Sequence, residues 1–207
     1  MKRLLVGLGA LLILGVSVPA AANAQLVTFD DYMCPQDPDY RFITDPYMGF
    51  NWDAFGVLNT SIYSLNPSGY QNGVVSGVCV GYNIGASIAT IAASPFTFNS
   101  GYFTAAWNDG LNLEVTGYLG ATQLYQSTHT LNTSGSLFLS FGWAGIDRVT
   151  FQSWGGTDNP ELPGAGQHFA VDNMAFNNVP EPASMVLLLT GLGAVVGVGM
   201  RRRKTAD

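Results

Sequence analysis

Residues 108–116, Asn-Asp-Gly-Leu-Asn-Leu-Glu-Val-Thr, show most clearly what kind of fold this chain adopts. Leu111, Leu113 and Val115 alternate with polar residues, and this two-residue period predicts a β-strand with one buried face. The Asn-Asp-Gly that precedes them is typical of a turn, because these residues tolerate positive φ angles. Segment 122–130 can fold back on this strand, so the two segments together predict an antiparallel hairpin.

Short alternating segments of this kind recur along the whole middle of the chain. They are bounded by Gly, Asn and Pro at intervals of about 8–12 residues, and no long window shows the period of a helix. We therefore predict an all-β fold, an antiparallel β-sandwich or jelly roll, over residues 25–179. The other strands are expected at residues 26–31, 50–58, 74–82, 87–92, 102–107, 137–141, 146–151 and 167–176.

The first 24 residues have the pattern of a secretory signal peptide. Lys2 and Arg3 precede an apolar run at residues 4–18. Small residues at positions 22–24 suit the narrow site of a signal peptidase, so we expect cleavage after Ala24. The alternative is a retained N-terminal transmembrane helix, which would normally be longer and lack the adjoining cleavage site.

Residues 183–200 form a second uncharged segment near the C-terminus. As a helix its eighteen residues would rise about 27 Å, close to the bilayer core of about 30 Å, so we predict a transmembrane span. The basic residues that follow are expected to stay in the cytoplasm, which places the preceding chain outside the membrane. These basic residues are Arg201, Arg202, Arg203 and Lys204.

Pro180, Glu181 and Pro182 lie immediately before this span. The two prolines keep the helix from extending backwards, because each fixes φ and lacks an N–H donor. The order of tripeptide, glycine-rich span and basic end resembles the PEP-CTERM sorting tail of Gram-negative, biofilm-forming bacteria. The resemblance covers residues 180–207 and implies recognition by an exosortase, a membrane processing enzyme.

That resemblance also implies a route for the protein. The precursor would be exported and anchored in the inner membrane. It would then be released or transferred to the cell surface or its exopolysaccharide. Within the domain, segments at 49–59, 105–111, 145–151 and 169–173 resemble uncharacterised secreted sandwich proteins that carry the same tail. This second resemblance implies no particular activity.

The charge of residues 25–179 limits the partners of this domain. Arg41 and Arg148 are its only basic residues, against twelve acidic ones, for a net charge of −10. Such a surface repels nucleic acid, so nucleic-acid binding is excluded. Cys34 and Cys79 are an even pair in an exported domain and are expected to form a disulfide. Two buried free thiols are the alternative.

No catalytic motif stands out. His129 and His168 are the only histidines, and neither adjoins a serine or cysteine motif of known geometry. A glycosidase would need two carboxyl groups about 5–10 Å apart, but Glu114 and Glu161 are the only glutamates of the domain. We therefore expect no enzymatic activity, and an unrecognised hydrolase is the least favoured hypothesis.

Two binding sites can be suggested from residue type and position. Asp30 and Asp172 lie in the expected first and last strands, which often neighbour each other in sandwiches, and their oxygens could bind a structural calcium ion. The alternative is that they hydrogen-bond nearby backbone. Trp154 in a glycine-rich loop and Trp107 beside a turn could stack on sugar rings, although core packing is the alternative.

From these observations we expect a non-enzymatic cell-surface or extracellular-matrix protein that is sorted through its tail. The alternative is a module that binds carbohydrate, such as an exopolysaccharide, with or without calcium.

Overall fold

The computed structural model describes residues 24–178 except 32, 37 and 45. The chain divides into two compact units, and the fold described below belongs to the unit of residues 22–179. Its elements are β1 Ala24–Val27, β2 Tyr40–Phe42, β3 Asn51–Asp53, β4 Phe55–Asn59, α1 Gly69–Asn72, β5 Cys79–Asn83, a 3-10 turn Ile84–Ala86, β6 Ala89–Ala105, β7 Asn108–Asp109, β8 Leu111–Leu119, β9 Thr122–Leu131, β10 Leu137–Trp154, β11 Thr157–Asp158 and β12 Phe169–Asn178. The all-β prediction is confirmed.

The predicted terminal segments lie outside these residues. They are the signal peptide apart from Ala24, the tripeptide at 180–182, the span at 183–200 and the basic end at 201–204. Within the part of the chain that the structure describes, no helix is long and apolar enough to cross a membrane.

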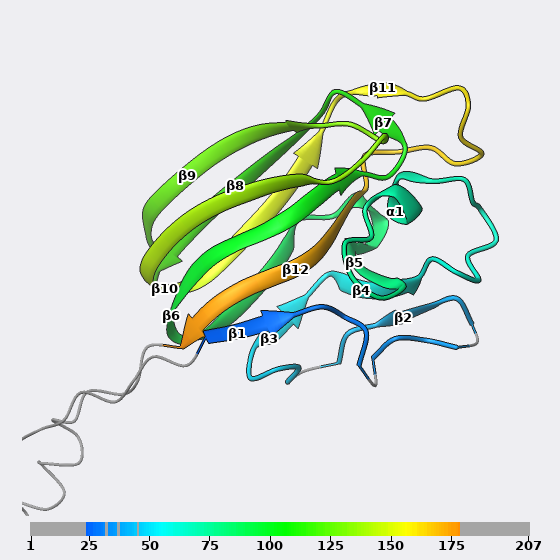
Figure 1. Ribbon diagram of the computed structural model, residues 1–207. Helices are drawn as coiled ribbons and strands as arrows, with labels where there is room; N and C mark the ends of the chain where they lie inside the picture. Colours follow the sequence, from blue (N-terminus) through cyan, green and yellow to red (C-terminus); the bar gives the residue numbers. More distant parts are fainter. Residues whose placement is uncertain (1–23, 32, 37, 45, 179–207) are drawn as a thin grey trace, which may run out of the picture. The chain divides into compact units, whose positions relative to one another are not determined.

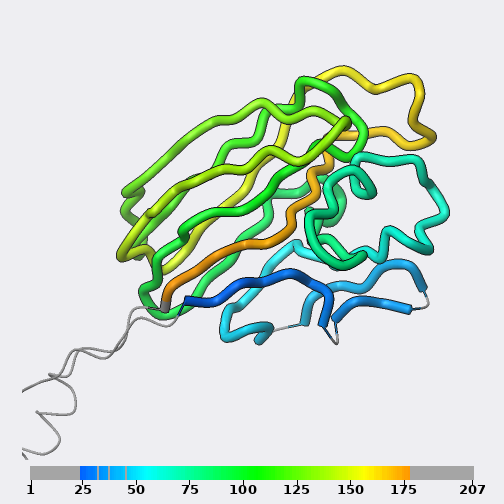
Figure 2. Tube along the Cα trace, viewed as in Figure 1, coloured from blue at the N-terminus to red at the C-terminus, as the bar shows by residue number. Residues whose placement is uncertain are grey.

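The strands form one antiparallel path in the order β2-β4-β5-β12-β6-β10-β8-β9 (Figure 1). β1 adds to β12, β3 adds to β6, and β7 pairs with β11 in a small separate ribbon. The predicted hairpin is confirmed, because β8 pairs with β9 from Leu111↔Leu131 to Leu119↔Thr122. β1 lies beside β12, as expected for the first and last strands (Figure 2).

Two long strands bend this sheet into a sandwich-like pair of layers. The first part of β6 pairs with β3 and with the second half of β10, whereas its later part pairs with β12 and with the first half of β10. The register of β10 shifts around Gly142 and Gly145, whose φ angles are +63° and +72°. Bulges and bends of this kind allow a strand to pass from one layer to the other.

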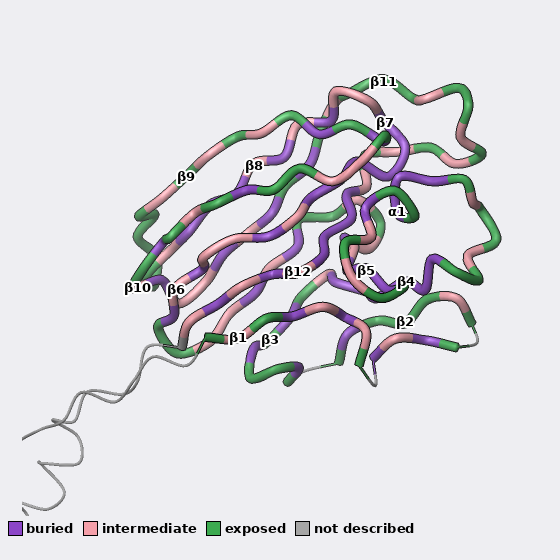
Figure 3. The backbone as a smooth tube through the Cα atoms, viewed as in Figure 1, coloured by how far each residue is buried: buried purple, intermediate pink, exposed green. Residues whose placement is uncertain are grey.

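The two layers enclose an aromatic core. Phe151 on β10 pairs with the first part of β6, but its ring packs against Phe98 and Phe103 from the later part of β6. Both pairs of ring centroids are 5.8 Å apart. On β8, Leu111, Leu113 and Val115 are fully buried, whereas Asn112 and Glu114 between them are half-buried (Figure 3). Thr116 and Gly117, which follow, are buried as well. The three side chains that the two-residue period predicts to be buried are therefore the ones that face the core.

A second, smaller cluster lies outside this core. It is made of Leu58, Tyr70, Val80, Ala106, Trp107 and Ala170. α1 brings Tyr70 into this cluster, because Ser68 caps the helix by accepting the Gln71 N–H at 3.3 Å. The backbone N–H of Gly69 donates to the Ala106 carbonyl at 2.9 Å and fixes the helix to the end of β6.

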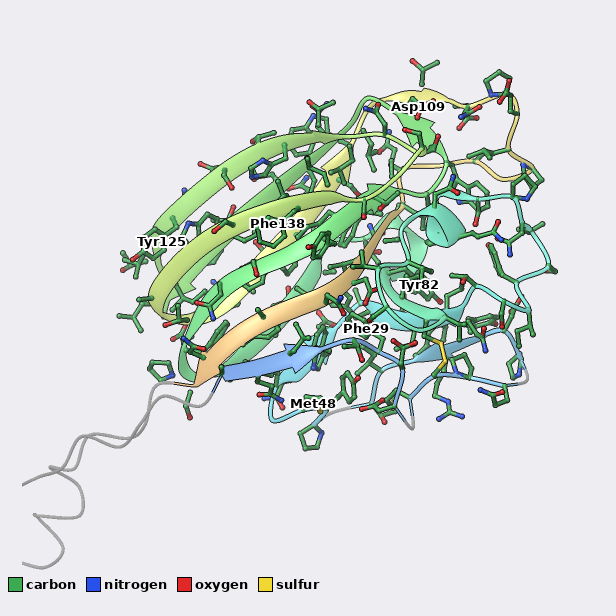
Figure 4. The ribbon with its side chains drawn as sticks, viewed as in Figure 1. Phe29, Met48, Tyr82, Asp109, Tyr125 and Phe138 are labelled. Carbon is green, nitrogen blue, oxygen red and sulfur yellow. A yellow bond between two sulfur atoms is a disulfide. The ribbon has the colours of Figure 1, made fainter. Side chains whose placement is uncertain are left out.

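Cys34 and Cys79 form a disulfide, which confirms the predicted pairing (Figure 4). Their Cα atoms are 5.8 Å apart and the bond closes a sequence separation of 45 residues. It ties the loop after β1 to the start of β5.

Candidate functional site

The second cluster opens into a pocket of about 310 Å³. Five of its lining residues are aromatic, and they come from different parts of the chain. The lining residues are Tyr40, Leu58, Tyr63, Leu65, Tyr70, Tyr82, Trp107, Gly164, Ala165 and His168. The volume lies at the lower end of the range of about 300–1,000 Å³ that is usual for small-molecule sites.

Tyr70 forms the buried floor of this pocket, with 3% of its surface exposed. Its ring meets Tyr63, Tyr82 and Trp107 edge to face, with centroid distances of 5.6, 5.8 and 5.5 Å. Tyr40 and Leu65 are 45% and 42% exposed and therefore form the rim. The result is a box of rings around one buried phenol.

Two glycines allow the walls to approach the backbone closely. Gly56 lies opposite Tyr82 in the β4–β5 pair, and a Cβ atom at Gly56 would come within 2.6 Å of the Tyr82 ring. A Cβ atom at Gly164 would come within 2.5 Å of the Trp107 ring. Figure 4 shows Tyr82 beside α1, where it lies against the second cluster.

The pocket is uncharged at neutral pH. Burial raises the pKa of Tyr82 to about 12, with smaller contributions from Tyr40, Tyr63 and Asp39, and burial raises the pKa of Tyr70 well above its usual value. Burial also lowers the pKa of His168, so its imidazole is neutral. The phenols of Tyr70 and Tyr82 therefore stay protonated and can serve as hydrogen-bond donors.

Trp107 and Trp154, the two predicted sugar contacts, have different positions. Trp107 is 3% exposed and belongs to the second cluster, but it also forms part of the pocket wall. Trp154 ends β10 and is 38% exposed, as expected for a solvent-facing ring. It does not line the pocket. No sequence pattern predicted Tyr40, Tyr63, Tyr70 and Tyr82 as a group.

Asp30 and Asp172 converge on one loop, as the pairing of the first and last strands suggests. One Asp30 oxygen accepts the N–H groups of Val78 and Cys79 at 2.8 and 2.9 Å. One Asp172 oxygen accepts those of Val75 and Ser76 at 2.7 and 2.9 Å. Burial, partly opposed by these hydrogen bonds, raises the pKa of Asp172.

The hydrogen bonds of these two carboxylates bear on the predicted calcium site. Calcium takes six to eight oxygen ligands, whereas backbone N–H groups point at both carboxylates here. Asp30 also lies close to the sulfurs of Cys34 and Cys79, but those sulfurs form the disulfide and are not thiolate ligands. The geometry favours the alternative, in which the two aspartates bind the backbone of residues 75–79.

His129 lies half-buried on β9, the last strand of the sheet, and its ring centroid is 5.9 Å from that of Phe141. Its Nε2 lies 2.9 Å from the Ser127 hydroxyl, and burial lowers its pKa. A serine nucleophile also needs a third group that orients the histidine. Among the described residues, no carboxylate is hydrogen-bonded to His129, so the pair lacks that third group.

Comparison with known proteins gives one family match and several similar folds. Residues 178–204 match the PEP-CTERM protein-sorting motif. No curated protein matches the chain as a whole or in part. The fold resembles that of a DUF4465 family protein from Bacteroides caccae, with a TM-score of 0.54 and 11% identity over 74% of this chain and 98% of that one.

Two further solved structures are more distant. A DUF4465 family protein from Bacteroides ovatus has a TM-score of 0.47 and 10% identity, covering 76% of this chain and 99% of that one. TmCBM61, solved in complex with β-1,4-galactotriose, has a TM-score of 0.28 and 8% identity, covering 64% of this chain and 86% of that one. These similarities are too weak to bear on function.

The family match agrees with the order of residues seen in the sequence: proline-flanked glutamate, apolar segment and basic end. A motif of this kind implies an exported protein that is anchored through its C-terminus and processed by an exosortase. The chain thus carries a PEP-CTERM protein-sorting motif at residues 178–204, attached to an all-β domain.

Proposed function

We propose that this is a non-enzymatic surface or matrix protein whose β domain binds carbohydrate in the aromatic pocket. The tail would deliver the domain to the cell exterior, and the pocket would hold it to a glycan there. The observation that carries the binding role is the box of Tyr63, Tyr70, Tyr82 and Trp107.

Ring faces and protonated phenols are a suitable combination for a sugar. The apolar side of a pyranose ring can stack on an aromatic side chain, while its hydroxyls accept and donate hydrogen bonds at the ring edges. Ligand sites generally combine a mostly apolar lining with a few placed polar groups. Here Tyr63, Tyr82 and His168 would supply those polar groups.

The non-enzymatic part of the proposal rests on the surroundings of the reactive side chains. The Ser127–His129 pair has no orienting carboxylate among the described residues, and Asp30 and Asp172 bind backbone N–H groups. His168 lines the pocket, but the ten lining residues include no carboxylate that could act with it.

A glycan array tests this function. The chain from residue 25 to residue 179 includes the whole described core, so it can be used as purified protein. We expect it to retain at least one glycan. Tyr63→Ala should weaken that binding by about tenfold or more, equivalent to about 1.4 kcal/mol, because it removes one wall of the pocket.

Trp154→Ala is the matched control, since it removes an exposed ring that does not line the pocket. If Trp154→Ala abolishes binding and Tyr63→Ala does not, the glycan binds at the end of β10 instead. If the array retains nothing, the carbohydrate-binding role is wrong.

A further inference from the structure

The charge around the pocket narrows the class of sugar that it can take. Among the described residues, none of the ten that line the pocket is Asp, Glu, Lys or Arg. A carboxylate ligand would therefore find no cation to pair with inside it. Burying an unpaired charge is expensive, so a neutral ligand is favoured on desolvation alone.

Asp39 adds repulsion next to the pocket. Its Oδ2 accepts the Ser64 N–H at 3.2 Å, and its backbone carbonyl accepts the Asn59 N–H at 2.8 Å. These bonds hold it near the pocket walls, and its carboxylate helps to raise the pKa of both Tyr63 and Tyr82. A ligand carboxylate would meet the same field.

The whole domain acts in the same direction. Two arginines against twelve acidic residues give residues 25–179 a net charge of −10. A surface of this sign lowers the local concentration of anions.

Resting on the proposed carbohydrate-binding role, we propose that the aromatic pocket takes an uncharged sugar and rejects the corresponding uronic acid. The selectivity comes from a neutral aromatic box beside the Asp39 carboxylate. It would direct the protein to neutral glycans even where acidic polysaccharide is present.

Matched pairs of sugars give the test. The probes are the methyl glycosides of glucose, galactose and mannose, each compared with its uronic acid, which differs only at the sixth carbon. Dissociation constants are measured by calorimetry with the 25–179 chain. We expect at least one neutral member to bind about tenfold or more tightly than its uronic acid at low salt. The ratio should narrow in 1 M salt, where the screening length falls to about 3 Å.

Asp39→Asn separates the charge from the shape of the pocket, because the amide keeps an oxygen that can accept the Ser64 N–H. This change should improve uronic acid binding several-fold and bring the dissociation constants of the uronic acid and its neutral partner closer together. Asp53→Asn is the matched control, since Asp53 is an exposed carboxylate on β3 and does not line the pocket. It should leave the ratio as it is.

The outcomes distinguish carbohydrate binding itself from selectivity for uncharged sugars. If a uronic acid binds as tightly as its neutral partner and Tyr63→Ala weakens both, the charge selectivity is wrong and carbohydrate binding stands. If none of the six probes binds and the array also retains nothing, both are wrong. A ratio unchanged by Asp39→Asn would overturn the role of Asp39.

Discussion

Replacing Gly56 by alanine should disturb the pocket through a single atom. A Cβ atom at this position would lie 2.6 Å from Cε1, 2.7 Å from Cζ and 2.8 Å from the hydroxyl of Tyr82. Ordinary contact begins at 3.4 Å, so the ring must move by 3.4 − 2.6 = 0.8 Å. The Tyr70 ring, whose centroid lies 5.8 Å away, limits movement toward the pocket floor.

Overpacking of this size costs about 1–3 kcal/mol. For a domain of this length, each kcal/mol lowers the melting temperature by about 2–4 °C, so we expect Gly56→Ala to melt about 2–12 °C lower. The displaced ring should also weaken the binding of any glycan that the array identifies. Thermal melts followed by circular dichroism and a binding titration measure the two effects.

The double variant Gly56→Ala/Tyr82→Leu tests the cause. Tyr82→Leu removes the ring that clashes with the new Cβ atom. The loss of unfolding free energy in the double variant should therefore differ from the sum of the two single losses by more than about 0.5 kcal/mol, the margin within which independent sites add. Gly135→Ala is the control, because a Cβ atom there meets nothing within 4 Å and should have little effect. Additive destabilisation with unaltered glycan binding would refute the reasoning.

Three further predictions concern the rest of the chain. Thiol labelling after denaturation should find neither Cys34 nor Cys79 free, and two labelled thiols per chain would contradict the disulfide. Replacing both cysteines should lower the free energy of unfolding by about 4 kcal/mol, because the bond closes a loop of 45 residues. Chelator should leave the melting temperature unchanged, and Asp172→Asn should destabilise equally with and without calcium, since the carboxylate accepts backbone N–H groups; a melt that falls in chelator and recovers with calcium would restore the metal hypothesis. Alanines at 180–182 should leave export intact while uncleaved precursor accumulates in the membrane fraction, and mature protein of normal amount on a gel would show that the tripeptide is not recognised.

The sequence predicted most of the strands but not the bends that shape the sheet. Residues 137–141 and 146–151 were expected as two strands, because each segment alternates and glycines lie between them. They are parts of β10, in which both glycines have positive φ and kink the strand without reversing it. Residues 87–92 and 102–107 likewise belong largely to the single strand β6, which runs on through Pro95. A residue that permits positive φ fits a bulge as well as a turn, and only the pairing partners decide between them.

The opposite error occurs at residues 50–58, which were expected as one strand. They form β3 and β4, separated at Ala54 with a φ of +56°. Alanine gives no signal of a break, since positive φ is unusual for it. The surrounding structure imposes the break, because β3 pairs with β6 whereas β4 pairs with β5.

The pocket was still harder to foresee. Its aromatic residues lie far apart in the sequence, on β2, after β4, on α1, on β5 and after β6. Trp107 was suggested because it stands beside a turn, yet it is a buried wall rather than an exposed contact. The expected pairing of the first and last strands correctly placed Asp30 near Asp172. Their hydrogen bonds to backbone N–H groups of residues 75–79 could not be predicted, because those donors do not depend on residue type.

Strand β12 runs from the aromatic pocket to the first residue of the sorting motif. Ala170 near its start pairs with Tyr82 in the pocket wall, and Asn178 at its end is the first residue of the sorting motif. Eight residue steps along a strand of about 3.3 Å each separate these points by about 26 Å. The pocket and the start of the sorting motif are therefore at opposite ends of the same strand. Under the proposed carbohydrate-binding role, a glycan in the aromatic box would therefore lie about 26 Å along β12 from residue 178, where the sorting motif begins.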